Sequence, residues 1–198
     1  MRVHHLLGCS FLLGSVFIAG CAADTDNESA ARPVMTIDPQ AAVHLKGGKR
    51  AAPAFNDGGL TLSAGGGLSG LGNADLLVHL VAEGDAFATC TNPAGATQPP
   101  GQNPADVTLS GTQAIPASEI KNGTVQFSLS TGAPASPIAG APGCPNTQWT
   151  QTIDDVSFSS AVITVVQGGA TVLTLSCTFS PSTANGPVAT PSATCTEG

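Results

Sequence analysis

The stretch SAVITVVQGGATVLTLSCTF, residues 160–179, contains two runs of β-branched and aliphatic residues separated by Gly168 and Gly169. Runs of this kind joined by two glycines are typical of a β-hairpin, because glycine adopts the positive φ angles of a tight hairpin turn. In the second run every other residue is apolar or a cysteine, and these residues share one face: Leu173, Leu175, Cys177 and Phe179. We therefore predict a hairpin whose second strand directs Cys177 into the core.

The chain before and after this hairpin shows further short strands. In GTVQFSLS, residues 123–130, apolar and polar residues alternate, which predicts a strand with one buried face. ADLLVHLVAEG, residues 74–84, is apolar on both faces at its middle, which predicts a central strand of a sheet. The same criteria predict strands over roughly 59–63, 85–91, 106–110, 147–158 and 192–196.

Helical patterns are scarce by comparison. Only IPASEIK, residues 115–121, fits a single helical turn. GGGLSGLG, residues 65–72, has the glycine spacing of a dinucleotide-binding turn, but a strand rather than a helix is predicted after it, so we interpret it as a flexible glycine turn. The sequence therefore predicts an all-β fold, a two-sheet β-sandwich of roughly 7–9 strands joined by proline- and glycine-rich loops.

Four cysteines lie in the part of the chain that these strands occupy. An even number in an exported domain is typical of disulfides, and two bridges between four cysteines allow three connectivities. We favour Cys90–Cys144, because it joins two long proline-rich loops. We favour Cys177–Cys195, because Pro191 cannot donate to a strand ladder, so the last strand begins after it and brings Cys195 opposite Cys177.

The N-terminus carries the features of an export signal. Arg2 precedes an apolar run, residues 6–20, that is too short to span a bilayer, since a spanning helix needs about 20 residues. The run leads into IAGC, residues 18–21, which resembles the lipobox of bacterial lipoproteins. The resemblance implies a signal peptide over residues 1–20, its removal, and a lipid on Cys21. The alternative is an ordinary signal peptide that releases a soluble secreted protein.

The segment after the signal lacks a structural pattern. Residues 21–57 show no sustained period of 2 or 3.6, and we interpret them as the lipidated N-terminus and a flexible tether. The sandwich domain then covers residues 58–198. Lipoproteins without an aspartate directly after the lipidated cysteine are sent to the outer membrane in bacteria that have one, and Ala22 fits this pattern. We therefore expect an extracytoplasmic protein whose membrane partner is reached through the N-terminal lipid.

The domain itself resembles small secreted β-rich proteins of bacteria. The matching segments lie between residues 75 and 195, and they are CTNPAG, PGQNPADV, IPASEIKNGT, PGCPN and VLTLSCTFSP. The resemblance implies one exported domain, and it implies neither an activity nor a site.

The charge of the chain argues against a nucleic-acid partner. The formal net charge is −7, and Lys121 is the only basic residue after Gly59. Binding to phosphate backbones needs a basic surface, which this composition does not provide. An enzyme is also disfavoured, because the domain offers one histidine, His79, in a predicted strand, and no GxSxG motif. We therefore expect no catalytic residue and no cofactor, with a hydrolase as the remote alternative.

Two sets of residues are candidate ligand contacts. Glu83, Asp85, Asp154 and Asp155 fit a calcium site if they converge, but no DxDxDG-like loop is present. The two adjacent aspartates also fit a β-bulge, because the apolar residues before and after them fall out of phase. Trp149 either stacks on a sugar or aromatic ligand or is the largest anchor of the core, the commoner role of tryptophan. We predict no further metal site.

These observations predict a non-enzymatic, lipid-anchored protein that acts as a surface binding or structural module. The alternative is a carbohydrate- or calcium-binding surface module that uses the proline-rich loops and the acidic pairs. The ligand class left open is a protein or a glycan.

Overall fold

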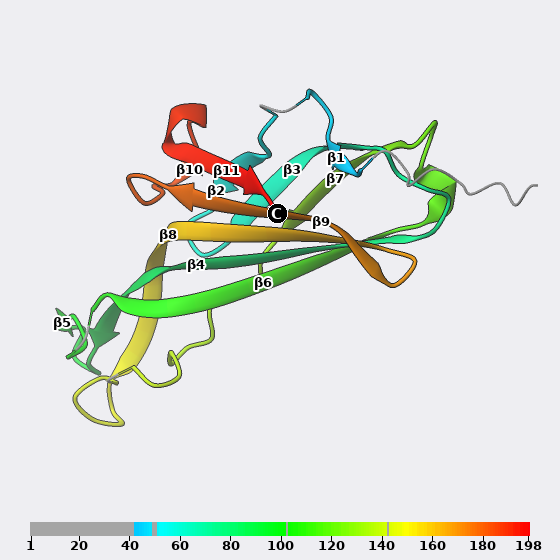
Figure 1. The fold of residues 1–198 in the computed structure, drawn as a ribbon. Coiled ribbons are helices and arrows are strands. Elements are labelled where there is room, and N and C mark those ends of the chain that lie inside the picture. Colours follow the sequence, from blue (N-terminus) through cyan, green and yellow to red (C-terminus); the bar gives the residue numbers. More distant parts are fainter. Residues whose placement is uncertain (1–41, 49–50, 102, 142) are drawn as a thin grey trace, which may run out of the picture. The chain divides into compact units, whose positions relative to one another are not determined.

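Two antiparallel β-sheets pack face to face in the computed structural model, which describes residues 42–48, 51–101, 103–141 and 143–198 (Figure 1). These residues belong to one compact unit, Ile37–Gly198. The lipobox and Cys21 lie outside the described residues. The predicted all-β, two-sheet sandwich is confirmed. The described residues form eleven strands, of which three have two residues each and eight are longer.

The larger sheet has the strand order β11-β9-β8-β4, and both β6 and β5 pair with the remaining side of β4. Its strands are β4 (Leu76–Thr91), β5 (Thr97–Gln98), β6 (Ala105–Ile115), β8 (Thr150–Gln167), β9 (Ala170–Phe179) and β11 (Ala193–Glu197). The predicted hairpin is confirmed as β8–β9, and its turn residues Gly168 and Gly169 have φ angles of 59° and 86°. The predicted central strand is confirmed as β4.

The smaller sheet is built around β3, which pairs with β7 on one side and with β2 and β1 on the other. Its strands are β1 (His44–Leu45), β2 (Ala54–Asp57), β3 (Leu62–Ser69), β7 (Thr124–Ser130) and β10 (Gly186–Pro187). Two short 3₁₀ helices complete the fold, η1 (Ala117–Glu119) and η2 (Thr190–Ser192). The first lies inside the segment predicted to form a helical turn.

The folded domain begins earlier in the chain than predicted. β1 and β2 lie within residues 21–57, the segment predicted to be the lipidated N-terminus and a flexible tether, and both pair with β3. These strands are too short to show a sequence period. They are held by tertiary contacts, since Leu45 and Phe55 are buried in the core.

The prediction of a flexible turn over residues 65–72 is wrong for its first half, because Gly65, Gly66 and Gly67 form the middle of β3. Gly66 lies directly opposite Phe127 on β7. A Cβ atom on Gly66 would lie 3.2 Å from the Phe127 ring, so the absence of a side chain leaves room for the ring to cover the strand. An aromatic side chain that covers a strand glycine in this way supplies the burial that glycine lacks.

Two pairs of predicted strands are continuous in the structure. β4 joins the predicted strands 74–84 and 85–91, and β8 joins 147–158 to the first arm of the hairpin. The pairing of β8 with β4 skips Asp154 and Ser159, so each is the extra residue of a β-bulge. The bulge predicted at the aspartate pair is therefore confirmed. The bulges let polar residues interrupt the alternation without ending the strand.

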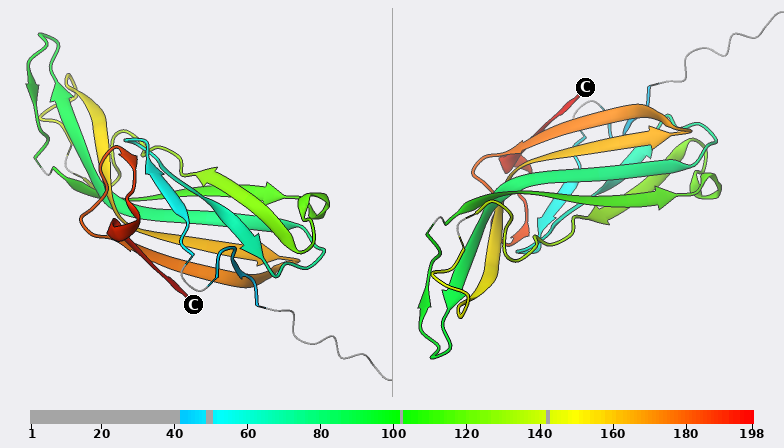
Figure 2. Two further views of the ribbon diagram at one scale, coloured as in Figure 1. Left: turned by 90° about the horizontal axis from the view of Figure 1, so that it is seen from above. Right: turned by 90° about the horizontal axis from the view of Figure 1, so that it is seen from below.

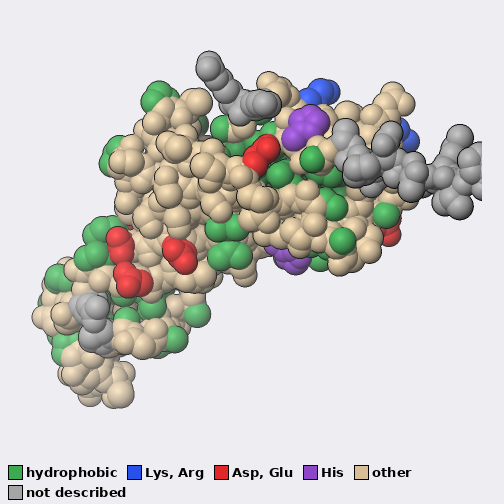
Figure 3. Space-filling model, in the orientation of Figure 1, with side chains coloured by type: hydrophobic (Ala, Val, Ile, Leu, Met, Phe, Trp, Pro, Cys, Tyr) green, Lys and Arg blue, Asp and Glu red, His purple; other side chains and the backbone are tan. Residues whose placement is uncertain are grey.

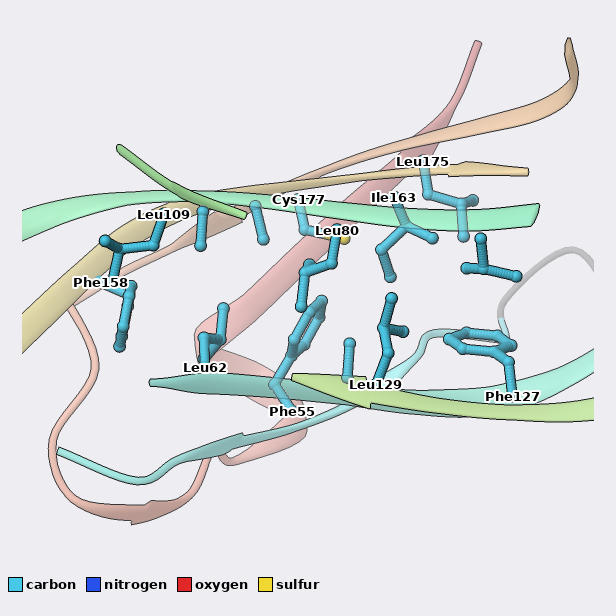
Figure 4. Close-up of a cluster of buried hydrophobic side chains, with 14 of the residues drawn as sticks. Phe55, Leu62, Leu80, Leu109, Phe127, Leu129, Phe158, Ile163, Leu175 and Cys177 are labelled. Atoms are coloured by element: carbon cyan, nitrogen blue, oxygen red, sulfur yellow. The ribbon is translucent and has the colours of Figure 1, made fainter. Parts of the chain in front are cut away.

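The core lies between the two sheets. Figure 4 shows side chains of the smaller sheet facing those of the larger sheet, and among them are Phe55, Phe127, Leu129, Leu80, Ile163 and Cys177. Phe55 meets Phe179 edge to face, with ring centroids 5.0 Å apart. The face of β9 predicted to be apolar is buried along its whole length. Burial of these side chains supplies most of the force that holds the sheets together.

The two sheets touch through their backbones where β6 passes the end of β7. Gly132 N donates a hydrogen bond to Ser110 O at 2.9 Å, so the chain leaving β7 is bonded to β6. Next to this bond, a Cβ on Gly111 would lie 1.9 Å from Ser130 O. Only glycine fits at this position.

A buried polar group ties the turn between β2 and β3 to the larger sheet. Asp57 and Thr183 are almost fully buried. Asp57 accepts hydrogen bonds from Gly59 N, at 2.8 Å, and from the Thr183 hydroxyl. Thr183 in turn accepts from Phe158 N, at 2.9 Å. This chain of bonds joins the β2–β3 turn to the part of β8 that precedes its pairing with β9.

Both predicted disulfides are confirmed, Cys90–Cys144 and Cys177–Cys195. Cys195 lies directly opposite Cys177 in the β11–β9 ladder, and β11 begins after Pro191 as predicted. The disulfides bridge segments 54 and 18 residues apart in the sequence. The longer closure restricts the unfolded chain more, so it contributes more stability.

Candidate functional site

A two-stranded ribbon extends the larger sheet beyond the smaller one. β6 pairs with β4 only as far as Ala86, and β9 pairs with β8 only from Ser160 onward. Past these points β4 and β8 continue together, with β5 beside β4 (Figure 2). The loop between β7 and β8, which we call the β7–β8 loop (residues 131–149), is tied to the inner face of this ribbon by the disulfide Cys90–Cys144.

A pocket of about 510 Å³ lies between the ribbon and the β7–β8 loop. The residues that matter for its chemistry are Ser136, Cys144, Asn146, Trp149, Thr150 and Gln151. Its volume is within the range of small-molecule binding sites. The pocket is open to solvent and mixes apolar with polar lining, so it offers both a stacking surface and hydrogen-bonding groups.

The disulfide Cys90–Cys144 holds the pocket in place. Cys90 is fully buried on the inner face of β4, and its Cα lies 5.6 Å from that of Cys144 in the loop. Gln151 is directly opposite Cys90 in the β4–β8 ladder, so the two side chains share a face. The Ser136 hydroxyl donates to Gln151 O at 3.1 Å, which ties the loop to β8 a second time.

Trp149 lies at the pocket and outside the core. It directly precedes β8, is partly exposed, and is held by a turn in which Trp149 N donates to Asn146 O at 3.1 Å. Asn146 Oδ1 accepts from Gln148 N at 2.9 Å in the same turn. The commoner role of tryptophan, as a core anchor, is therefore not the role of Trp149. The reason is its position on the ribbon, where the smaller sheet does not reach.

Gln151 is a pocket residue that the sequence analysis did not single out. Its Oε1 atom is buried and accepts no hydrogen bond from any described residue. A buried acceptor without a donor is uncommon, because it has lost its bonds to water without replacement. The sequence does contain one signal for Gln151. Residues i and i+2 point to the same side of a strand, and Gln151 comes two residues after Trp149.

The four carboxylates proposed for calcium are distributed over two places. Glu83 and Asp85 lie on the outer face of β4, beside a second pocket of about 340 Å³ that also includes Asp106. Asp154 accepts a hydrogen bond from the Thr89 hydroxyl at 2.5 Å, and Asp155 Oδ1 is buried without a partner among the described residues. Within the described ranges, no three metal-ligating side chains converge on a common point.

Asp106 is the acidic neighbour that the sequence did not reveal, because it is close to Asp85 only through strand pairing. The two residues are directly opposite in the β4–β6 ladder. Burial raises the pKa of Asp85, and the hydrogen bond and the charge of Asp106 raise it further. Charged side chains are otherwise sparse on the face shown in Figure 3, where acidic groups gather near one end.

The histidine that the sequence predicted to lie in a strand occupies an ordinary strand position. His79 is on the outer face of β4, and its Nδ1 atom lies 3.3 Å from the Thr112 hydroxyl on β6. The side chain is partly exposed. This geometry adds nothing to the remote alternative of a hydrolase.

The disulfides bear on the compartment in which the protein folds. Two disulfides are typical of an oxidising, extracytoplasmic compartment. In the part of the chain that the structure describes, no helix has the length and hydrophobicity needed to cross a bilayer. Comparisons with protein families, with curated proteins and with solved structures found no match to this chain.

Proposed function

We propose that the protein is a non-enzymatic lipoprotein that displays the β-sandwich outside a bacterial membrane as a binding module. The pocket around Trp149 is its ligand site. The observation that carries the binding role is a partly exposed tryptophan beside a buried, unpartnered amide oxygen, in a pocket held by a disulfide. Aromatic residues and a few convergent polar groups are what small-molecule sites use for affinity and orientation.

The composition of the pocket supports binding over catalysis. Among the described residues that line it, none carries an ionisable side chain, and its one cysteine is in a disulfide. General acid–base or nucleophilic catalysis needs a group that accepts or donates a proton. Amides, hydroxyls and an indole bind ligands without either step.

The anchor is proposed from the sequence. IAGC, residues 18–21, resembles a lipobox, and the diacylglycerol is added to the Cys21 thiol in that family. Two or more acyl chains on one residue hold a protein at a membrane far more firmly than one chain does. The disulfide-containing domain is then on the oxidising side of that membrane.

The anchor is tested by Cys21→Ser in the full-length protein expressed in a bacterium with an outer membrane. We expect this variant to lose labelling with radioactive palmitate and to leave the membrane fraction. Cys9→Ser is the matched control, because Cys9 lies within the same apolar run and should change neither result. If Cys21→Ser stays in the membrane fraction after a high-salt wash, the anchoring part of the proposal is refuted.

A further inference from the structure

The lining of the Trp149 pocket indicates which class of ligand it binds. We infer that the Trp149 pocket binds a neutral saccharide, an inference that rests on the proposed binding function. It follows from three features of the described residues: a partly exposed tryptophan, amide and hydroxyl groups in the lining, and a lining without charge.

Trp149 supplies the stacking surface. A sugar ring has an apolar face of C–H groups edged by hydroxyls, so it pairs an apolar surface with polar edges in the way the pocket does. The backbone of Trp149 is held by its bond to Asn146 O, and the loop before it is held by the disulfide at Cys144. A tryptophan side chain has only two rotatable bonds, so it binds with little loss of conformational freedom.

Gln151 and its neighbours supply the hydrogen bonds. Gln151 lines the pocket, and its Oε1 atom is buried without a donor among the described residues; turned toward the pocket, this oxygen would accept a hydrogen bond from a ligand hydroxyl. Asn146 uses its Oδ1 atom within the turn, which leaves its NH₂ group as a donor. Thr150 adds a hydroxyl from the first residue of β8. Hydroxyls both donate and accept, so a sugar can satisfy amide oxygens and amide hydrogens together.

Electrostatics favour a neutral sugar over an anionic one. Anionic ligands are bound by arginine and lysine, and no described lining residue of this pocket is basic. The chain carries a formal net charge of −7, which repels anions. A proline-rich peptide is the competing ligand for a tryptophan site, but such peptides use grooves lined by several aromatic residues, whereas Trp149 is the only aromatic among the described lining residues.

The chain provides its own probe for the experiment. Trp149 is the only tryptophan and tyrosine is absent, so the intrinsic fluorescence of the protein reports on this pocket. The full-length protein in detergent is titrated with cellohexaose, maltohexaose, laminarihexaose and chitohexaose. Polygalacturonate serves as the anionic comparison and decaproline as the peptide comparison. We expect a saturable change in emission with at least one neutral oligosaccharide and none with polygalacturonate.

Variants then locate the binding by calorimetry, which does not need the tryptophan. Trp149→Ala should weaken binding at least about tenfold, because a tryptophan at the centre of a site carries much of its affinity. Gln151→Leu should weaken it about threefold to tenfold, the loss expected for one hydrogen bond. Phe87→Ala is the matched control, since Phe87 is an exposed aromatic outside the pocket lining, and it should change nothing. The melting temperature of each variant confirms that it folds.

Two outcomes overturn the inference. The first is that no neutral oligosaccharide binds, whether or not polygalacturonate does. The second is that neutral sugars bind to Trp149→Ala with the same affinity as to the wild type. Saturable quenching by decaproline alone would remove the sugar while leaving a binding module at the same pocket. The membrane anchor is judged separately by Cys21→Ser, so the two proposals fail by different results.

Discussion

Gly111→Ala tests the contact between the two sheets at its tightest point. The added Cβ would lie 1.9 Å from Ser130 O, 2.7 Å from Ser130 C and 3.1 Å from the Cα of Thr131. All three atoms are backbone, so no side-chain rotation can relieve the clash. The chain leaving β7 has to move away from β6 by more than an ångström.

The loss in free energy of unfolding can be estimated from the contacts that this movement disrupts. Overpacking a well-packed site costs about 1–3 kcal/mol by itself. The same movement loosens the bonds Gly132 N to Ser110 O and Thr131 N to Leu62 O, each worth about 1 kcal/mol. We expect the free energy of unfolding to fall by about 4 kcal/mol, which for a domain of this size lowers the melting temperature by about 10 °C.

Chemical unfolding followed by the fluorescence of Trp149, without reductant, measures this difference. Gly132→Ala is the matched control. Gly132 has an ordinary φ angle, it forms the neighbouring hydrogen bond, and its added Cβ would meet only Ser110 O, at 3.9 Å. The control should therefore stay within about 1 kcal/mol of the wild type. If Gly111→Ala is as stable as Gly132→Ala, the two sheets do not meet at Gly111 as described.

Three further perturbations have defined outcomes. Thr183→Val should lower the free energy of unfolding by about 3 kcal/mol in urea titrations, because it leaves the buried Asp57 carboxylate short of a donor; an unchanged midpoint would contradict this. The raised pKa of Asp85 means that the folded protein keeps a proton that the unfolded chain has lost, so stability falls as pH rises from 3.8 through the raised value. Asp85→Asn should make the melting temperature fall less between acid and neutral pH. If the melting temperature depends on pH as it does in the wild type, the raised pKa of Asp85 is not the cause. The double variant Cys90→Ala/Cys144→Ala should lose about 4 kcal/mol, by loop-closure entropy over the 54-residue separation, and a loss under about 1 kcal/mol in urea titrations would contradict it.

The parts of the fold that the sequence predicted are those fixed by neighbours along the chain. The β8–β9 hairpin follows from a glycine pair between two apolar runs, and Cys177 faces the core because its strand alternates. Pro191 sets the start of the last strand, and that start determines the register of Cys195. The bulge at Asp154 was visible as a break in phase between apolar residues.

The parts that the sequence did not predict depend on residues far apart in the chain. Gly66 belongs to a strand because the Phe127 ring covers it, and the two residues are distant in sequence. Asp106 meets Asp85 only through the β4–β6 register. Gln151 belongs to the site because β4, which is distant in sequence, pairs with β8 beyond the smaller sheet and holds the β7–β8 loop through Cys90–Cys144. Such contacts leave no periodic signal, because they are made across strands and not along them.

The position of β4 has a consequence for how the chain reaches its folded state. β4 pairs with β8 from Leu76–Gln167 at one end to Thr91–Thr150 at the other, so its main partner is made much later in synthesis. Contacts this distant require a large loop to close before they stabilise anything, which slows folding. Until the C-terminal hairpin is delivered, the edge of β4 that pairs with β8 stays open to other chains. Completion of that hairpin is therefore the step that commits the whole domain, and a chain interrupted before β8 should aggregate and not fold in part.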